Sequence, residues 1–298
     1  MLRARARAKI NLFLRVFPPR SSSYHDLLSL FTSVDLWDDL SLLPAAEANF
    51  ESLSVLSEAP LPGSEMLSRG GENIICSAEA LFSEMSGLSC QSLAWQLKKR
   101  IPVGSGLGGG SADAAAALLL LNEHHGRPLK EDELFDAAKT LGSDIPFFLR
   151  GGAAIVAGKG EIVTPIEALP EQWLLLIRPR ESVKSAKAYG LLDHYNHWME
   201  SKDEGVSHDS AKEVARARVD ALLECLRKGE IDRAAPLIDN DFEGVIEKEI
   251  PAVARLLAVI RSQLRATCFL TGSGSAIVVL AESEAHALSM KDELACKS

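Results

Sequence analysis

The sequence predicts an α+β protein with two domains. In each half of the chain, strand-like segments precede a group of helical segments, without the regular alternation of an α/β fold. The chain has 298 residues, a length that suggests about two domains, each with its own core. We place the boundary near residue 160, with an N-terminal domain over residues 1–160 and a C-terminal domain over residues 161–298.

In the N-terminal half, residues 4–17 read as a strand with Lys9 and Asn11 on one face, because side chains two apart share a face. Two further strand-like runs, LLSLFTSV and LWDDLSLL, lie within residues 24–43. The remaining expected elements are a helix over 73–85, a strand over 92–101, and helices over 111–124 and 131–141.

The C-terminal half opens with two short apolar runs, AAIVAG and WLLLIRP, and is then mostly helical. Periodicity predicts helices over 184–195, 211–228, 231–238 and 250–264. The segments CFLTGSG and AIVVL follow, and a last helix is expected over 284–295.

Composition excludes several classes of protein. The net charge of −9 argues against nucleic acid or an anionic membrane as the main partner. No apolar run approaches the roughly 18 residues of a membrane span, and INLFLRVF, after the N-terminal RARARAK, is too short and polar for a signal sequence. Five scattered cysteines without a C-x-x-C pair fit a reducing compartment. We expect a cytoplasmic protein, either monomer or homodimer.

The most informative segment is the glycine-rich loop PVGSGLGGGSA at residues 102–112. Five of the seven residues from Gly104 to Gly110 are glycine, and Ser111 opens an alanine-rich helix. Glycine lets several backbone N–H groups approach one ligand, and a helix N-terminus attracts anions. The segment therefore predicts a phosphate-binding site.

Two common nucleotide motifs fit this loop poorly. Gly104, Gly106 and Gly109 match G-x-G-x-x-G, but no opening βαβ unit precedes them, and Glu123 lies within the same helix. The Walker A pattern fails because Gly110 occupies the lysine position. A plain glycine turn is the remaining alternative, although five glycines exceed what a turn requires.

Three further segments carry candidate chemistry. Lys9 lies between apolar residues of a strand and must either reach solvent or meet an anion. Asp144 lies at an expected helix-to-strand corner, where a half-buried carboxylate suits a general base, although a turn cap is equally compatible. The rings of Tyr24, His25 and Phe31 can stack on a planar base or simply fill a core. Asp113, expected in the first helical turn, is assigned no role.

Four motifs in order resemble the GHMP kinase family. They are AKINL at 8–12, the glycine loop, GSDIP at 142–146 and TGSG at 271–274. The triple glycine, Tyr24-His25 and GSDIP most resemble the branch that phosphorylates 4-diphosphocytidyl-2-C-methyl-D-erythritol in the non-mevalonate isoprenoid pathway. The family usually has Asp-Gly before Tyr-His, where this chain has Ser22-Ser23. Kinases of the homoserine or mevalonate type, and a non-catalytic protein with the family's fold, are the alternatives.

The resemblance implies a ribosomal S5 domain 2-like N-terminal domain and a ferredoxin-like C-terminal domain. It implies ATP and Mg²⁺, a small substrate with a cytidine diphosphate group, and Lys9 and Asp144 as catalytic residues. The ATP-binding residues would be Pro102, Val103, Gly104, Ser105, Gly106, Leu107, Gly108, Gly109, Gly110, Ser111 and Ala112. The substrate-binding residues would be Asn11, Tyr24, His25, Phe31 and Tyr189.

Overall fold

A computed structural model describes residues 1–19, 25–48, 50, 52–57, 72–181, 183–195 and 208–295. The chain forms two units that are discontinuous in sequence. The first unit consists of Met1–Lys9, Ser33–Val103 and Leu107–Pro165, and the second of Ile10–Thr32, Gly104–Gly106 and Ile166–Ser298. Residues 10–32 and 104–106, from the expected N-terminal domain, thus belong to the second unit.

Two long strands contribute to both units. They are β1 (Leu2–Phe17) and β2 (Asp26–Pro44). We expected two runs within residues 24–43, but β2 is continuous. The chain around Val34 contains no glycine, proline or asparagine that would break a strand before Pro44.

The first unit contains most of a mixed sheet. In the order β3-β4-β2-β1, strand β3 (Leu53–Ser57) is parallel to β4 (Leu93–Lys99), and β4 is antiparallel to β2. Strand β5 (Ala153–Gly158) pairs with β2 and with β6 (Ile162–Ile166). Strand β6 was not expected from the sequence.

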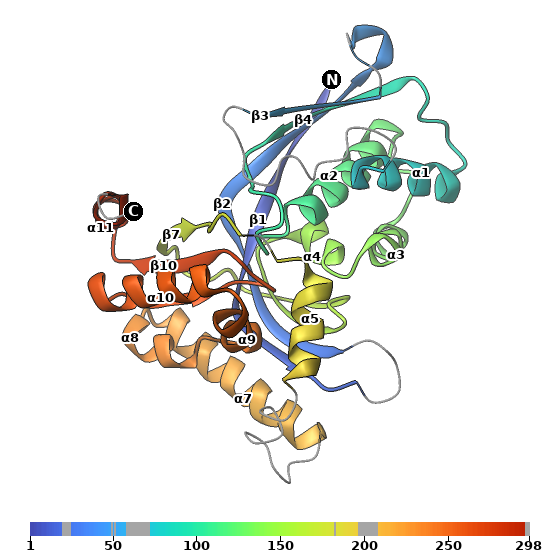
Figure 1. Ribbon diagram of the computed structural model, residues 1–298. Helices are drawn as coiled ribbons and strands as arrows, with labels where there is room; N and C mark the ends of the chain where they lie inside the picture. Colours follow the sequence, from blue (N-terminus) through green and yellow to red (C-terminus); the bar gives the residue numbers. More distant parts are fainter. Residues whose placement is uncertain are drawn as a thin grey trace. The chain divides into compact units, whose positions relative to one another are not determined.

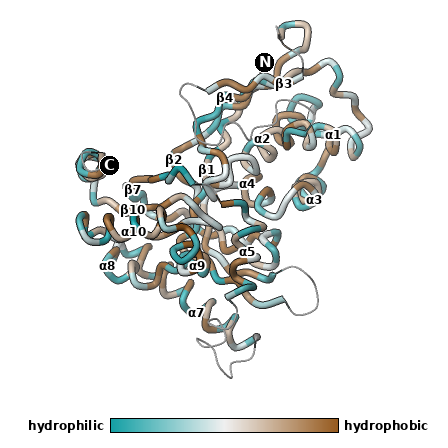
Figure 2. The backbone as a smooth tube through the Cα atoms, in the orientation of Figure 1, coloured by the Kyte–Doolittle hydropathy of each residue, from teal (hydrophilic) through white to brown (hydrophobic). Residues whose placement is uncertain are grey.

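Four helices lie on one side of β2 and β4 (Figure 1): α1 (Ile74–Ser86), α2 (Gly109–His124), α3 (Glu131–Leu141) and α4 (Ile145–Arg150). Phe82 of α1 and Trp95 of β4 are fully buried in the core that these helices form with the sheet. Hydrophobic and hydrophilic residues mix along α1 (Figure 2), as expected of a helix with one buried face.

Helix α2 is the central helix of this unit. It starts at Gly109, two residues earlier than expected, directly after Gly108 in a left-handed conformation with φ of +74°. Its alanines let neighbouring elements approach closely, and ten of its residues are buried. After the helix, the Asn122 side chain donates to Leu129 O and accepts from Leu129 N, both at 3.0 Å, which fixes the turn to α3.

The second unit carries a three-stranded antiparallel sheet in the order β7-β10-β9. Its strands are β7 (Trp173–Ile177), β9 (Cys268–Leu270) and β10 (Ile277–Ala281). A short strand, β8 (Asp239–Asn240), runs parallel to β1. The helices are α5 (Ser185–His194), α7 (His208–Arg227), α8 (Ile231–Ala234), α9 (Asp241–Glu249), α10 (Pro251–Gln263) and α11 (Glu284–Ala295).

Two helical expectations in this unit need correction. The helix expected over 231–238 ends at Ala234, and a short 3₁₀ turn over Ala235–Leu237 follows, because Pro236 cannot donate to a continuing helix. Helix α9 was not expected; its N-cap Asn240 accepts a hydrogen bond from Phe242 N at 3.0 Å. Across the described residues, the helices are too short or too polar to cross a bilayer.

Two neighbouring leucines of α2 test the assignment of its buried face. Leu118 is fully buried, whereas Leu119 is 38% exposed. We expect Leu118→Ala to lower the free energy of unfolding by about 2–5 kcal/mol, since it removes buried apolar volume. Leu119→Ala is the matched control and should cost well under half of that in urea denaturation. Equal losses would contradict the placement of α2.

Candidate active site

The glycine-rich loop joins β4 to α2 and relies on backbone conformations that favour glycine. Gly104, Gly106 and Gly108 have φ of +65°, +82° and +74°. No side chain caps the start of α2, so the first N–H groups of the helix are left available for an anion.

In the first unit, the end of the loop leaves no room for side chains. A Cβ atom on Gly108 would lie 2.6 Å from Phe148 Cζ and 3.3 Å from Lys9 Cγ. A Cβ atom on Gly109 would lie 2.9 Å from Ile101 Cγ2. The Lys9 amide donates to Leu107 O at 3.0 Å, so the end of the loop is hydrogen-bonded to β1 at Lys9.

In the second unit, the start of the loop packs on the turn at residues 271–274. A Cβ atom on Gly106 would lie 2.6 Å from Thr271 O, and one on Gly272 would lie 2.7 Å from Gly106 O. Ala276 N also donates to Ser105 O at 3.1 Å. The TGSG motif of the sequence is therefore a support for this end of the loop.

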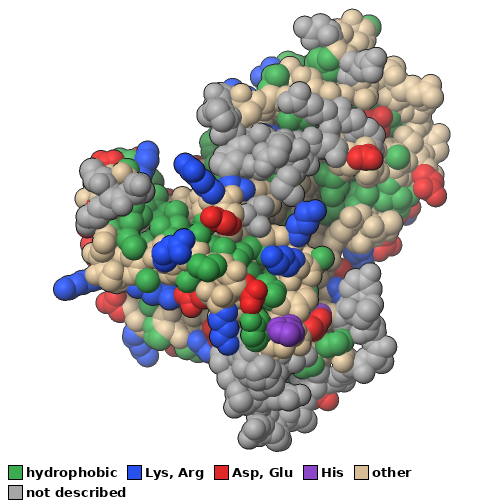
Figure 3. Space-filling model, viewed as in Figure 1, with side chains coloured by type: hydrophobic (Ala, Val, Ile, Leu, Met, Phe, Trp, Pro, Cys, Tyr) green, Lys and Arg blue, Asp and Glu red, His purple; other side chains and the backbone are tan. Residues whose placement is uncertain are grey.

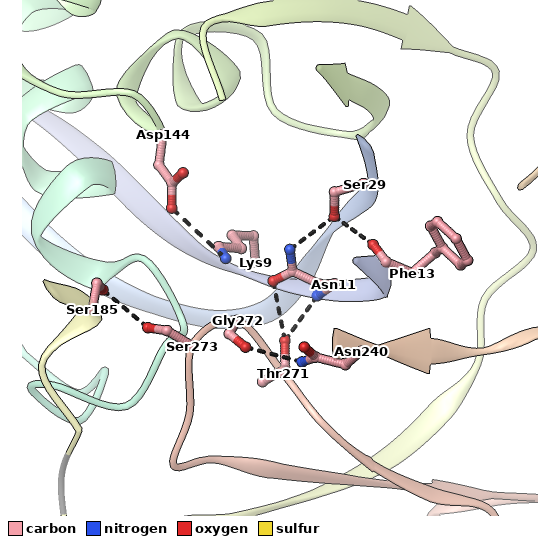
Figure 4. Close-up of polar contacts among 10 residues, drawn as sticks. All are labelled: Lys9, Asn11, Phe13, Ser29, Asp144, Ser185, Asn240, Thr271, Gly272 and Ser273. Atoms are coloured by element: carbon pink, nitrogen blue, oxygen red, sulfur yellow. Dashed lines mark hydrogen bonds and ion pairs between the residues drawn. The ribbon is translucent and has the colours of Figure 1, made fainter. Parts of the chain in front are cut away.

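Lys9 and Asp144 form an ion pair in the first unit (Figure 4). The distance from Lys9 Nζ to Asp144 Oδ2 is 3.7 Å, and the two side chains are 4% and 37% exposed. Burial lowers the pKa of Lys9, and the charge and hydrogen bond of Asp144 oppose that shift. A carboxylate that is open on one side and held beside an ammonium group can accept a proton from a hydroxyl.

Local structure explains where Asp144 points. We expected a helix-to-strand corner, but Asp144 directly precedes the short helix α4, with Pro146 in its first turn. Proline is favoured there because its missing N–H would have no partner in the helix. A Cβ atom on Gly160 would lie 3.4 Å from Asp144 Oδ1, so the backbone of this glycine lies close behind the carboxylate.

Asn11 is buried and bonded within the protein in the second unit (Figure 4). Its amide N donates to Thr271 Oγ1 at 2.8 Å, and its Nδ2 donates to Ser29 Oγ at 2.9 Å. Asn240 Nδ2 donates to Leu270 O at 2.8 Å and to Gly272 O at 2.9 Å. The backbone N–H of Asn11 and the side-chain amide of Asn240 thus hold the 271–274 turn, and only 2% of Asn11 is exposed.

Two of the expected substrate-binding residues meet in the second unit. The rings of His25 and Tyr189 have centroids 5.3 Å apart, and His25 Nε2 lies 2.7 Å from Asp193 Oδ1. Phe242 also contacts Tyr189, edge to face, with the two ring centroids 5.0 Å apart. Phe31, by contrast, is 2% exposed within β2, and Tyr24 and Ser22-Ser23 lie outside the described residues.

A buried charge cluster next to the loop was missed from the sequence. Lys99 Nζ donates to Asp38 Oδ2 at 2.5 Å and to Asp113 Oδ2 at 2.8 Å. A signal did exist, because Lys99 continues the buried alternate positions of β4 after Trp95 and Leu97. A lysine on the buried face of a strand needs acidic partners. Since α2 starts at Gly109, Asp113 lies beyond the first helical turn.

Gly106 and Gly110 provide a matched test of the loop. Gly106→Ala combines a positive φ with a close contact to Thr271 O, so we expect it to lower the free energy of unfolding by about 2 kcal/mol. It should also weaken binding of a polyphosphate. Gly110→Ala is the control, since the nearest atom to its Cβ is Ile74 Cγ2 at 4.0 Å. Similar destabilisation of the two variants in thermal unfolding would contradict the loop geometry.

Comparisons with known proteins agree with this geometry. Models for the GHMP kinases N terminal domain and the GHMP kinases C terminal domain match residues 72–152 and 222–298. A 4-diphosphocytidyl-2-C-methyl-D-erythritol kinase of Gloeobacter violaceus is 33% identical over 287 residues, which cover 96% of this chain and 87% of the relative. The same enzyme of Pelotomaculum thermopropionicum is 33% identical over 277 residues, covering 93% and 88%.

Solved structures give the same result. A crystal structure of 4-(cytidine 5'-diphospho)-2C-methyl-D-erythritol kinase superimposes with a TM-score of 0.74 at 31% identity, covering 99% of this chain and 96% of that one. Mevalonate kinase of L. major, at 16% identity and a TM-score of 0.69 over 100% and 92% of the chains, shares the fold. Both family domains occur in order and close relatives align along nearly all of the sequence, so the chain belongs to the GHMP kinase family.

Proposed function

We propose that the chain transfers the γ-phosphoryl group of ATP to a hydroxyl of 4-diphosphocytidyl-2-C-methyl-D-erythritol, giving the 2-phosphate, in the non-mevalonate pathway to isoprenoid precursors. The observation that carries the proposal is the Lys9–Asp144 pair beside a glycine-rich loop that is hydrogen-bonded to Lys9. The relatives at 33% identity, both kinases of this compound, indicate the substrate. An enzyme of this pathway would work in the cytoplasm.

The loop would bind the ATP phosphates through main-chain N–H groups between Val103 and Ser111. The last of these groups lie at the N-terminus of α2, where the positive end of the helix dipole also favours an anion. Neither contribution requires a side chain to move. Phosphoryl transfer depends mainly on positioning and on neutralising charge, which this arrangement supplies.

Asp144 would accept the proton of the substrate hydroxyl as the oxygen attacks phosphorus. Lys9 would hold that carboxylate in place and offset the negative charge that develops on the transferred group. Because burial already lowers the pKa of Lys9, loss of the Asp144 charge would release the opposing effect and favour the neutral amine. The two side chains therefore depend on each other.

The donor set fits a magnesium ion that is held mainly by the substrate. Among the described residues there is no group of three or more His, Cys, Asp or Glu side chains that would form a protein cage for a metal. Mg²⁺ commonly keeps several waters and binds phosphate oxygens with one or two carboxylates. The ion would then be held by phosphate oxygens and waters, and Asp144 keeps its role as the proton acceptor. When bound, the ion would neutralise phosphate charge.

The cytidine end of the substrate would meet His25 and Tyr189. Stacking of a base on an aromatic ring contributes about 1–3 kcal/mol, and Asp193 fixes the imidazole of His25. Tyr24 is assigned to the same end on the basis of its motif. Asn11 and Phe31, each 2% exposed, would act beneath the site by holding the 271–274 turn and the β2 strand.

Two substitutions test the catalytic pair. We expect Asp144→Asn and Lys9→Met each to lower turnover by about 10²–10⁴-fold, as loss of a general base or its partner does. ATP binding, measured by calorimetry, should survive in Asp144→Asn. The controls are Asp136→Asn and Lys139→Ala, an exposed pair on α3 with a distance of 3.1 Å, which should keep full turnover. Wild-type turnover by either active-site variant would refute the assignment.

A substrate panel tests the reaction itself. ATP consumption is measured with the cytidine diphosphate substrate, homoserine, mevalonate and phosphomevalonate as acceptors. We expect turnover with the first at a rate at least about 10²-fold above the others. A site that binds the cytidine diphosphate group would have its polar groups left unpaired by an alcohol that lacks this group. Faster phosphorylation of another alcohol would assign the chain to that kinase type. No ATP consumption with any acceptor would leave a binding protein.

A further inference from the structure

The buried cluster of Lys99, Asp38 and Asp113 carries an inference about how the loop is tuned. All three residues lie in the first unit: Lys99 ends β4, Asp38 lies on β2, and Asp113 lies on α2. They are 3%, 0% and 3% exposed, so water does not screen them. The proposed reaction uses none of them.

Asp38 anchors the chain where it enters the loop. Its Oδ1 accepts hydrogen bonds from the backbone N–H groups of Arg100, at 2.5 Å, and Ile101, at 2.9 Å. Its Oδ2 accepts from Lys99. Three hydrogen-bond donors therefore surround this buried carboxylate.

Asp113 has a different environment. Its Oδ2 accepts from Lys99, but its Oδ1 is buried without a hydrogen-bond partner among the described residues. One ammonium and two carboxylates would leave a buried excess of negative charge, which is costly unless one acid takes up a proton. Asp113 accepts fewer hydrogen bonds than Asp38 and is therefore the acid that holds the proton.

The titration of the cluster agrees with this assignment. The pKa of Asp113 is raised to about 8, mainly by burial; Lys99 opposes this shift, and the charge and hydrogen bond of Asp38 add to it. Burial lowers the pKa of Lys99, but the charges of Asp113 and Asp38 outweigh it and the pKa is raised. The charged side chains of α3 and Arg150 of α4 are exposed, and Glu79 of α1 is hydrogen-bonded to Trp95. Lys99 and Asp38 are therefore the charged groups that govern the pKa of Asp113.

The cluster lies directly against the phosphate-binding end of α2. A Cβ atom on Gly109, the first residue of the helix, would lie 3.2 Å from Lys99 Nζ. With Asp113 protonated, the cluster is neutral and the positive end of the helix remains effective. With Asp113 ionised, the cluster carries a net negative charge where a polyanion must bind.

We propose that Lys99, Asp38 and Asp113 are positioning residues that fix both ends of the glycine loop and, through one shared proton, keep the phosphate-binding end of α2 free of negative charge. This inference rests on the proposed ATP binding of the loop. It predicts that ATP affinity falls as pH rises through the titration of Asp113, because the proton that favours the anion is lost.

The test compares wild type with Asp113→Asn, whose amide reproduces the neutral acid in shape and can still accept from Lys99 and donate to Asp38. ATP affinity and the KM for ATP are measured from pH 7 to pH 9. In the wild type we expect affinity to weaken about five- to tenfold beyond any change in the variant, with kcat less affected. Lys9 titrates in both proteins, so the difference between the profiles reports Asp113.

Each outcome decides a different point. Parallel profiles, or an affinity in Asp113→Asn at pH 7 more than about tenfold weaker than that of the wild type, would overturn the inference while leaving the proposed function intact. Absence of ATP binding by the wild type would instead refute the proposed function. If Asp113→Asn does not fold, calorimetry of Lys9→Met at pH 8.5 in buffers of different ionisation enthalpy decides, because this variant lacks the Lys9 amine. Proton uptake on ATP binding supports the shared proton, and its absence overturns it.

Discussion

The structure around the site depends on one steric constraint, the lack of space for side chains on the glycine loop. At Gly108 a single methyl group would collide with Phe148 and crowd Lys9, and at Gly109 it would collide with Ile101. The backbone can therefore lie directly on β1 and on the core, where the Lys9 amide bonds to Leu107 O. The N–H groups at the start of α2 are held in place by packing, without a side-chain cap.

Two buried lysines flank this loop and differ in their partners. Lys9 pairs with the half-exposed Asp144, and burial prevails so that the pKa of Lys9 is lowered. Lys99 has two fully enclosed carboxyl partners, and its pKa is raised. A lysine with a lowered pKa beside an open carboxylate suits chemistry on a substrate, whereas one locked between two acids suits a fixed positive charge. The same residue type thus serves two purposes in one unit.

Sequence patterns predicted the elements with strong periodicity and failed where tertiary contacts decide. The helix over 131–141 was predicted with the bounds that the structure has, and the apolar run AAIVAG coincides with strand β5. The cluster at Lys99 was missed because its partners, Asp38 and Asp113, are distant in sequence, and no local pattern reports such a pairing. The burial of Asn11 was missed for the same reason, since its partner Thr271 lies 260 positions away.

The acidic character of the chain also needs to be reconciled with a polyanionic ligand. A net charge of −9 would repel ATP if charges acted over long distances. At physiological salt, however, screening limits the range over which exposed charges interact to about 8 Å. On the face shown in Figure 3, Lys and Arg side chains are interspersed with Asp and Glu side chains. Buried groups are screened much less. Lys9, Lys99 and the first turn of α2 therefore set the local potential, and the protonation of one acid, Asp113, matters more to phosphate binding than many surface carboxylates.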